Sequence, residues 1–174
     1  MRFAEDEFCR LIETHQRMVF SIALRITVDY TTAEEVAQDV FLELYRSGGQ
    51  LGSEDHIRFW LRRVATHRAI DALRRISVRP EGSAEEWMEE HHAGDEDSGV
   101  STGLEARLET LLQGLPEPMR VAVVLRYQEE MPLEEIAVLL GKSIASVKGH
   151  LHQGLKLLRR KAAVTMKEYV RGQA

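Results

Sequence analysis

Residues 132–161 read PLEEIAVLLGKSIASVKGHLHQGLKLLRRK, and they predict two helices joined by a tight turn. The first helix follows Pro132, which suits the first turn of a helix because its missing N–H would have no partner there. Gly141 predicts the end of this helix, since glycine readily adopts the left-handed conformation found past helix C-termini. Ser143 is then a candidate N-cap for the second helix.

The second of these helices has an apolar face and a polar face when it is drawn at about 100° per residue. The apolar stripe consists of Ile144, Val147, Leu151, Leu155 and Leu158. The opposite face carries Ala145, Ser146, Gly149, Gln153, Lys156 and Arg160, with Lys148, His152 and Arg159 on one flank and His150 on the other. Small side chains in the first turns, followed by cations, suit the major groove of DNA. An ordinary helical hairpin with a solvated face is the alternative.

Charge is segregated along the chain. Residues 142–171 hold eight Lys or Arg against one acid, although the whole chain has 23 basic and 28 acidic residues. Residues 1–76, 77–104 and 105–174 carry net charges of −1, −7 and +3. The basic C-terminal part is typical of phosphate binding. The acidic middle part, rich in Gly and Ser, predicts a flexible linker.

The remaining periodic segments predict an all-α fold. Apolar residues recur at helical spacing over residues 8–25, 32–46, 57–76, 104–115 and 119–128. Thr31 and Glu34 fit a capping box at the start of the second helix, and the glycines of residues 47–55 predict a loop. We therefore expect two small helical domains, residues 1–76 and 105–174, joined by the acidic linker of residues 77–104.

The helix predicted over residues 57–76 is a second basic element. Residues 58–75 contain six arginines and one acid, with Phe59 and Trp60 between them. Aromatic rings can stack on unpaired bases while guanidinium groups hold phosphates. The simpler interpretation is that Phe59 and Trp60 belong to the core. The arginines cannot all be buried, and too few acids lie nearby in the sequence to pair with them.

Several function classes are disfavoured by composition. The longest apolar run, Val121 to Leu125, is far shorter than the roughly 20 residues that span a bilayer. Residues 1–10 are charged and lack the apolar core of a secretory signal, so we expect a cytoplasmic location without membrane insertion. Cys9 is the single cysteine; it permits no internal disulfide, and we expect it to face the core.

Neither a metal site nor enzymatic chemistry is predicted. The seven histidines lack the spacing of metal ligands, so we expect no metal and no cofactor. An enzyme acting on nucleic acid would need a constellation of carboxylates or histidines. The second basic helix offers only His67 and Asp71. Because these residues are four positions apart on one helix, we expect them to form a local hydrogen bond rather than a catalytic pair. We therefore expect a protein that is not an enzyme and has no catalytic residues.

Three segments resemble the bacterial RNA polymerase sigma factors of the extracytoplasmic-function class, within the sigma-70 superfamily. They are AEEVAQDVFLELYR (residues 33–46), FWLRRVATHRAIDALRR (residues 59–75) and LPEPMRVAVVLRYQEEMPLEEIAVLLGKSIASVKGHLHQGLKLLRR (residues 115–160). The resemblance implies that residues 1–76 are sigma region 2 and residues 105–174 are sigma region 4, with its helix-turn-helix. It implies a transcription initiation factor that binds core RNA polymerase, directs it to promoters and assists strand opening. The alternative is a helix-turn-helix regulator of the response-regulator output type, because VKGHL (residues 147–151) also resembles the DNA-binding helix of that class.

The resemblance also implies site residues and partners. The predicted contacts with the coiled coil of the polymerase's largest subunit are Val36, Gln38, Asp39, Phe41 and Leu42, and the polymerase flap is a further expected partner. The residues predicted to bind the downstream promoter element and the melted strand are Phe59, Trp60, Arg62, Arg63, His67, Arg74 and Arg75. The residues predicted to bind the upstream element are Ser143, Ser146, Lys148, Gly149, His150, Gln153 and Lys156. An anti-sigma factor is expected from the class.

The predicted recognition helix departs from the family pattern. Relatives usually show a run such as K-S-R-L-x-R-A-R, whereas residues 148–155 read KGHLHQGL. Three expected arginines are therefore absent. We expect either weaker binding of the upstream element or a different base sequence at that element.

Overall fold

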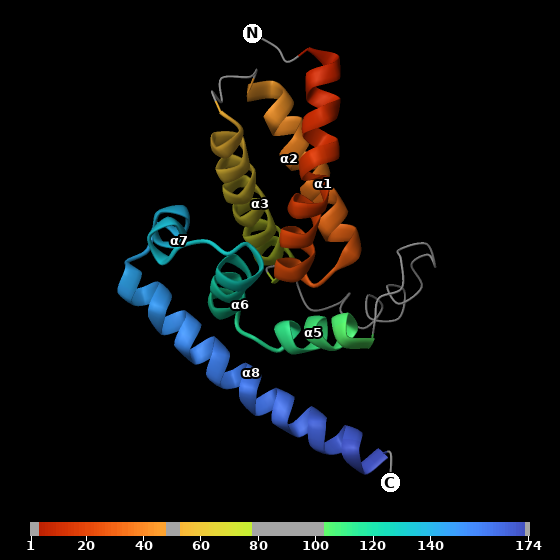
Figure 1. Cartoon of the computed structure of the whole chain (residues 1–174), viewed down its shortest axis with the longest axis vertical. Helices are drawn as coiled ribbons and strands as arrows, with labels where there is room; N and C mark the ends of the chain where they lie inside the picture. The colour runs from red at the N-terminus through yellow and green to blue at the C-terminus, as the bar shows by residue number, and fades with distance from the viewer. Residues whose placement is uncertain (1–3, 48–52, 78–102, 173–174) are drawn as a thin grey trace.

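The computed structural model describes residues 4–47, 53–77 and 103–172 of the chain (Figure 1). Every regular element in these ranges is a helix, which confirms the predicted all-α fold. Most of the predicted linker, and residues 48–52 of the predicted glycine-rich loop, lie outside the described residues. None of the described helices is long and apolar enough to cross a membrane.

The first unit packs three helices against one another: α1 (Glu5–Thr27), α2 (Tyr30–Ser47) and α3 (Glu54–Ser77). Their apolar stripes meet in a core in which Val19, Ile22, Val40, Leu44 and Leu61 are fully buried. Fully burying such side chains contributes about 1.5–3 kcal/mol each, which is the main force holding the unit together. Cys9 is exposed on α1, so the prediction that it faces the core was wrong.

The turn between α1 and α2 differs from the predicted capping box. Val28 adopts the left-handed conformation with φ 55° and ends α1, its N–H donating to the Leu24 carbonyl at 2.7 Å. The Asp29 carboxylate accepts the N–H of Thr32 at 2.7 Å, so Asp29 provides the cap. Thr31 lies inside α2, and the capping box of Thr31 and Glu34 was therefore wrong.

The second unit contains α5 (Gly103–Gln113), α6 (Glu117–Val123), the π-helical segment η1 (Val124–Gln128), α7 (Leu133–Leu140) and α8 (Ile144–Gly172). Figure 1 shows the long α8 in blue, running beneath α7, α6 and α5, and it contacts all three. Gly141 ends α7 with φ 60°, and the Ser143 hydroxyl accepts the N–H of Ser146 at 3.1 Å. The predicted turn and N-cap are thus both confirmed.

The two units touch. Helix α1 contacts α6 and η1, and two side chains of α3 reach Glu129, which follows η1, and Leu139 of α7. This contact between the units brings residues about 70 positions apart in sequence side by side.

Candidate nucleic-acid and protein interfaces

The N-terminal half of α8 is seated on the second unit by a short apolar face. Val147 and Leu151 are buried, and Leu155 and Leu158 are half-buried. Ile144, predicted on the same stripe, is 39% exposed because it lies in the first turn, beyond the core. Gly154 is buried where α8 crosses α6: a methyl group there would lie 3.1 Å from Val123 Cγ2 and 3.3 Å from Met119 Cβ. Glycine thus allows the close approach that fixes α8 against α6.

The structure brings most of the predicted upstream-element residues onto one exposed side of α8. Lys148, Gly149, Gln153 and Lys156 are exposed there, and the surroundings of Gly149 are open, with no atom within 4 Å of a methyl group at that position. Ser143 is exposed, with its hydroxyl engaged in the N-cap, and Ser146 is half-buried. His150 is also half-buried, with a buried Nδ1 that has no hydrogen-bond partner. Additional exposed cations on this helix and the preceding turn are Lys142, Arg159 and Arg160.

The basic side chains of α3 differ in their exposure and in their partners. Arg63, Arg74 and Arg75 are exposed, and Phe59 and Trp60 are half-buried, packed against the core. Arg68 donates to the Glu43 carboxylate at 2.7 and 3.2 Å; that hydrogen bond raises the pKa of Arg68.

Arg62 and His67 also have partners: Arg62 pairs with Glu129, and His67 Nε2 lies 2.9 Å from the Leu139 carbonyl. Sequence reasoning considered acids close to α3 in the chain. The acids that pair with Arg68 and Arg62 lie 25 and 67 residues away.

Helix α2 carries the predicted polymerase contacts on more than one side. Val36 is 4% exposed and lies in the core, so it supports the helix from within. Gln38 and Asp39 are exposed, and Leu42 is 50% exposed. Phe41 is half-buried. Asp39 lines a hollow at the junction with the end of α3, whereas Gln38 and Phe41 line a groove on another side of α2.

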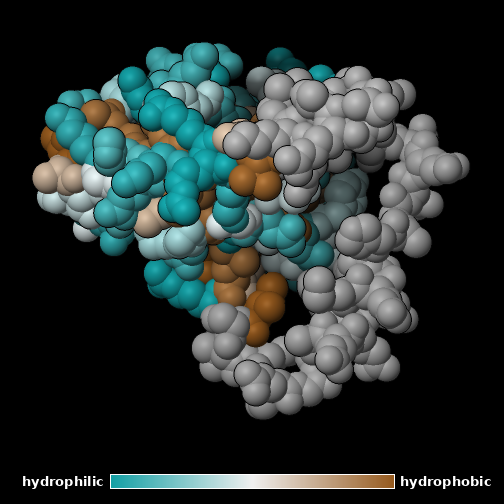
Figure 2. Space-filling view, turned by 90° about the horizontal axis from the view of Figure 1, so that it is seen from below, coloured by the Kyte–Doolittle hydropathy of each residue, from teal (hydrophilic) through white to brown (hydrophobic). Residues whose placement is uncertain are grey.

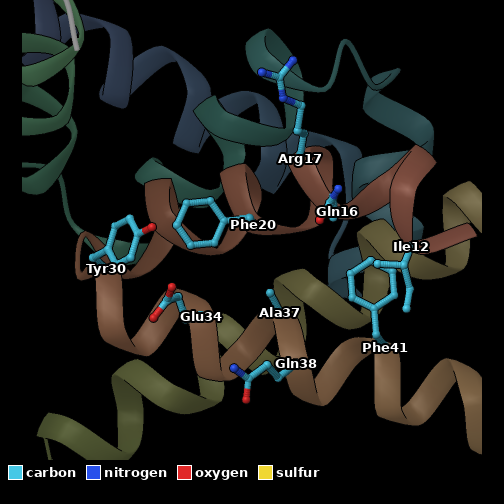
Figure 3. Close-up of a pocket in the computed structure, with 9 residues that line it drawn as sticks. All are labelled: Ile12, Gln16, Arg17, Phe20, Tyr30, Glu34, Ala37, Gln38 and Phe41. Atoms are coloured by element: carbon cyan, nitrogen blue, oxygen red, sulfur yellow. The ribbon is translucent and has the colours of Figure 1, made fainter. Parts of the chain in front are cut away.

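That groove lies between α1 and α2 (Figure 3) and has a volume of about 630 Å³. Its lining residues are Ile12, Gln16, Arg17 and Phe20 of α1, and Tyr30, Glu34, Ala37, Gln38 and Phe41 of α2. The rings of Phe20 and Tyr30 meet edge to face with centroids 5.1 Å apart. Apolar rings and aliphatic chains with a polar rim suit an amphipathic helix of another protein. Sequence reasoning missed the α1 side. Helical periodicity identifies the apolar face of a helix, but it does not show how much of that face the other helices cover.

A further apolar hollow lies between α5 and α8. Leu111, Leu157 and Val164 line it together with the cationic Arg160 and Lys161, and its volume is about 670 Å³. Val164 is 57% exposed. Seen from below, the surface is largely hydrophilic, and hydrophobic residues are gathered in a few patches (Figure 2). Among the described residues, no three His, Cys, Asp or Glu side chains gather as metal ligands would.

Comparison with known proteins gives a consistent result for both units. The family model of Sigma-70 region 2 matches residues 11–78, and that of Sigma-70, region 4 matches residues 105–158. The chain is 32% identical over 157 residues to the RNA polymerase sigma factor CarQ of Myxococcus xanthus, which covers 90% of this chain and 89% of CarQ. It is 25% identical over 166 residues to the ECF RNA polymerase sigma factor SigW of Bacillus subtilis, again covering 90% and 89%.

Two further sigma-factor relatives are longer, and the chain spans 44% and 59% of their lengths. Among solved structures, the sigma factor RpoE of Bartonella quintana, in complex with the anti-sigma factor NepR, has a similar fold. The TM-score is 0.67 at 16% identity, and the match covers 92% of this chain and 99% of that one.

Proposed function

The chain belongs to the extracytoplasmic-function class of RNA polymerase sigma factors, and we propose that its two helical units divide promoter recognition between them. A sigma factor serves transcription initiation. One observation carries the proposal. The family model of region 2 matches the first helical unit, and that of region 4 matches the second. The response-regulator alternative is not favoured, because it leaves α1, α2 and α3 without a role. We infer a protein that acts by binding and has no catalytic residues or cofactor.

Residues 105–174 are proposed to bind the upstream promoter element through α8. The exposed Lys148 and Lys156 can reach phosphates, while Gly149 and Gln153 lie between them and face the bases. Only Gln153 of this pair carries polar groups that can hydrogen-bond to a base edge. The expected binding is therefore weighted toward phosphate contacts and is strongly salt-dependent.

Residues 1–76 are proposed to bind core polymerase and the melted strand. The groove between α1 and α2, together with the neighbouring side of α2 that carries the exposed Asp39, is the proposed seat of the largest-subunit coiled coil. Its apolar floor accepts a helix, and the two acids Glu34 and Asp39 outweigh Arg17 and favour a basic partner. The exposed arginines of α3 are proposed to hold the phosphates of the strand, with Phe59 and Trp60 beside them. The hollow between α5 and α8 is the proposed contact for the polymerase flap.

Two further proposals concern the setting of the protein. An anti-sigma partner is supported by the similar fold of RpoE, which was solved in complex with the anti-sigma factor NepR. A cytoplasmic location is proposed because RNA polymerase and promoter DNA are found there. The segment of residues 77–104 is proposed to be the acidic connector between regions 2 and 4, and its net charge of −7 would suit a path through the basic channels of the polymerase.

Transcription in vitro with purified core polymerase tests the function. Templates from the source genome should give initiation that depends on this protein, and a complex with core should form on gel filtration. If neither is observed, the proposed function is wrong.

A charge reversal tests the polymerase surface of α2. Asp39→Arg should abolish complex formation with core polymerase while leaving the helical circular dichroism unchanged, because Asp39 is exposed. Glu134→Arg, the same charge reversal at an exposed position of α7, is the matched control and should bind normally. An unchanged complex for Asp39→Arg would remove this side of α2 from the interface.

A further inference from the structure

The C-terminal end of α5 is held by cations from two other helices. Lys161 Nζ of α8 donates to the Gly114 carbonyl oxygen at 2.7 Å, and Arg120 Nη1 of α6 donates to the Gln113 carbonyl oxygen at 3.5 Å. The last carbonyls of a helix lack partners within the helix and carry its partial negative charge, so cations stabilise them. The end of α5 is therefore tied to both α6 and α8.

Gly114 makes room for the ammonium group of Lys161. A methyl group added at Gly114 would collide with Lys161 Nζ, and it would lie 3.0 Å from Cε and 3.4 Å from Cδ of the same side chain. Among the glycines that the structure describes, Gly141 alone has a positive φ, so the backbone at Gly114 does not require glycine. Glycine at this position instead serves the contact with Lys161.

This contact forms one side of the hollow between α5 and α8. In the described part of the chain, α5 packs chiefly against α8 (Figure 1). Leu111 of α5 lines the hollow together with Leu157, Lys161 and Val164 of α8. The apolar side chains leave about 670 Å³ between them, so they do not interlock tightly enough to set the spacing of the two helices. The polar contact at Gly114 sets it.

We propose that Lys161 is a positioning residue, which acts through Gly114 to fix the spacing of α5 and α8 and so keeps the hollow open for a helical segment of the polymerase flap. This inference rests on the proposed function, in which the flap binds at this hollow. Because Lys161 is engaged with α5, the exposed Arg160 beside it is the cation that can pair with the bound segment. That segment should therefore carry an acidic side chain next to its apolar ones.

Two variants break the contact in different ways. Lys161→Met removes the ammonium group, whereas Gly114→Ala keeps the cation and fills its place. The end of a lysine side chain is flexible and Leu112 anchors α5 in the core, so both variants should let α5 swing without unfolding it. Since both act on one contact, the double variant should show no further change. Arg159→Met removes an exposed cation one turn from the DNA-facing half of α8 and outside the hollow, and it is the matched control for charge.

The spacing of the two helices can be measured in the full-length chain. In a Cys9→Ser background, spin labels at Leu108→Cys on α5 and His152→Cys on α8 report it, since both side chains are exposed. The parent and the charge control should give one narrow distance distribution, and both contact variants should broaden it. Circular dichroism establishes that each variant is folded. An unchanged distribution in both contact variants overturns the positioning role, and a change in Lys161→Met alone overturns the part assigned to Gly114.

Affinity for core polymerase tests the consequence of the spacing. Lys161→Met and Gly114→Ala should each weaken binding by about three- to tenfold, because a hydrogen bond of ordinary net strength favours one position of α5 by such a factor. The loss should disappear with core polymerase from which the flap is deleted. Affinity for upstream-element DNA should not change, because α6 holds the DNA-facing half of α8. Equal weakening in Arg159→Met, or a loss that persists without the flap, overturns the link to the flap.

Failure of the positioning role and failure of the proposed function give different results. If core polymerase does not bind the parent, the proposed function is wrong, while the spin-label distances still decide whether Lys161 positions α5. If the parent binds and the contact variants change neither the distances nor the affinity, only the positioning role is wrong. Changed distances with unchanged affinity would show that the spacing does not serve the flap.

Discussion

The close crossing of α6 and α8 predicts opposite effects for two alanine substitutions in the same helix. Gly154→Ala would place a methyl group 3.1 Å from Val123 Cγ2 and 3.3 Å from Met119 Cβ. Val123 is buried, and the Cβ of Met119 is fixed by the α6 backbone, so the helices must move apart. Such overpacking typically costs about 1–3 kcal/mol. Gly149→Ala meets nothing within 4 Å.

Both substitutions gain the same helix propensity, about 0.5–1 kcal/mol relative to glycine, so this gain cancels when the two variants are compared. Gly149→Ala should raise the free energy of unfolding by about that amount. Gly154→Ala should be less stable than Gly149→Ala by about 1–3 kcal/mol. Urea denaturation of the full-length chain, followed by circular dichroism, measures both values.

A double-mutant cycle identifies the cause of the difference. Val123→Ala removes the Cγ2 methyl group that faces Gly154, so it should cost less in the Gly154→Ala background than in the parent, with a coupling energy of about 0.5 kcal/mol or more. Equal stability of the two single glycine variants would refute the argument from close approach. A coupling energy of zero would show that Val123 is not the side chain that the new methyl group displaces.

Three other predictions address pH, a surface ion pair and DNA affinity. Burial lowers the pKa of His15 below the ordinary value of 6.5, so the unfolded chain binds a proton at this residue more readily than the folded chain does. The free energy of unfolding should therefore fall as the pH drops below about 6.5. In His15→Leu, the urea concentration at the midpoint of unfolding should change less between about pH 5 and 7. Glu43→Gln should lower the free energy of unfolding, measured by thermal unfolding, by no more than about 1 kcal/mol, because the side chains of Arg68 and Glu43 are 42% and 39% exposed. A larger loss would show that solvent does not screen this ion pair. Gly149→Arg should place a guanidinium group against the bases, so it should strengthen binding to some upstream-element sequences over others by about 1–3 kcal/mol in titrations of single-base variants; equal strengthening for every base would place Gly149 at the phosphates instead.

Local signals predicted the helices and the α7 to α8 turn well. Gly141 and Ser143 act through their own backbone neighbourhood, so their roles can be recognised from sequence. The same local reasoning placed the cap of α2 at Thr31, because Thr31 and Glu34 have the right spacing. Asp29 has an equally suitable spacing to Thr32, and the left-handed turn at Val28 decides between them.

Contacts between distant segments could not be predicted. Arg62 and Arg68 looked unpaired because their acids lie just after η1 and in α2, which only the folded chain brings to α3. For the same reason, sequence reasoning named docking residues on α2 alone and did not find the groove that α1 forms with it. Gly154 appeared only as a departure from the family pattern, and its contact with α6 becomes visible only when two helices are packed.

The open surroundings of Gly149 have a consequence for how this protein can diverge. Most positions at a binding surface trade stability for a new specificity, because the new side chain must displace a neighbour. At Gly149 there is room for a side chain, and almost any replacement also removes the helix cost of glycine. Replacing Gly149 should therefore raise the free energy of unfolding rather than lower it. With α8 bound to the upstream element as proposed, a duplicated gene could acquire a different promoter preference here in one step, without a prior stabilising mutation.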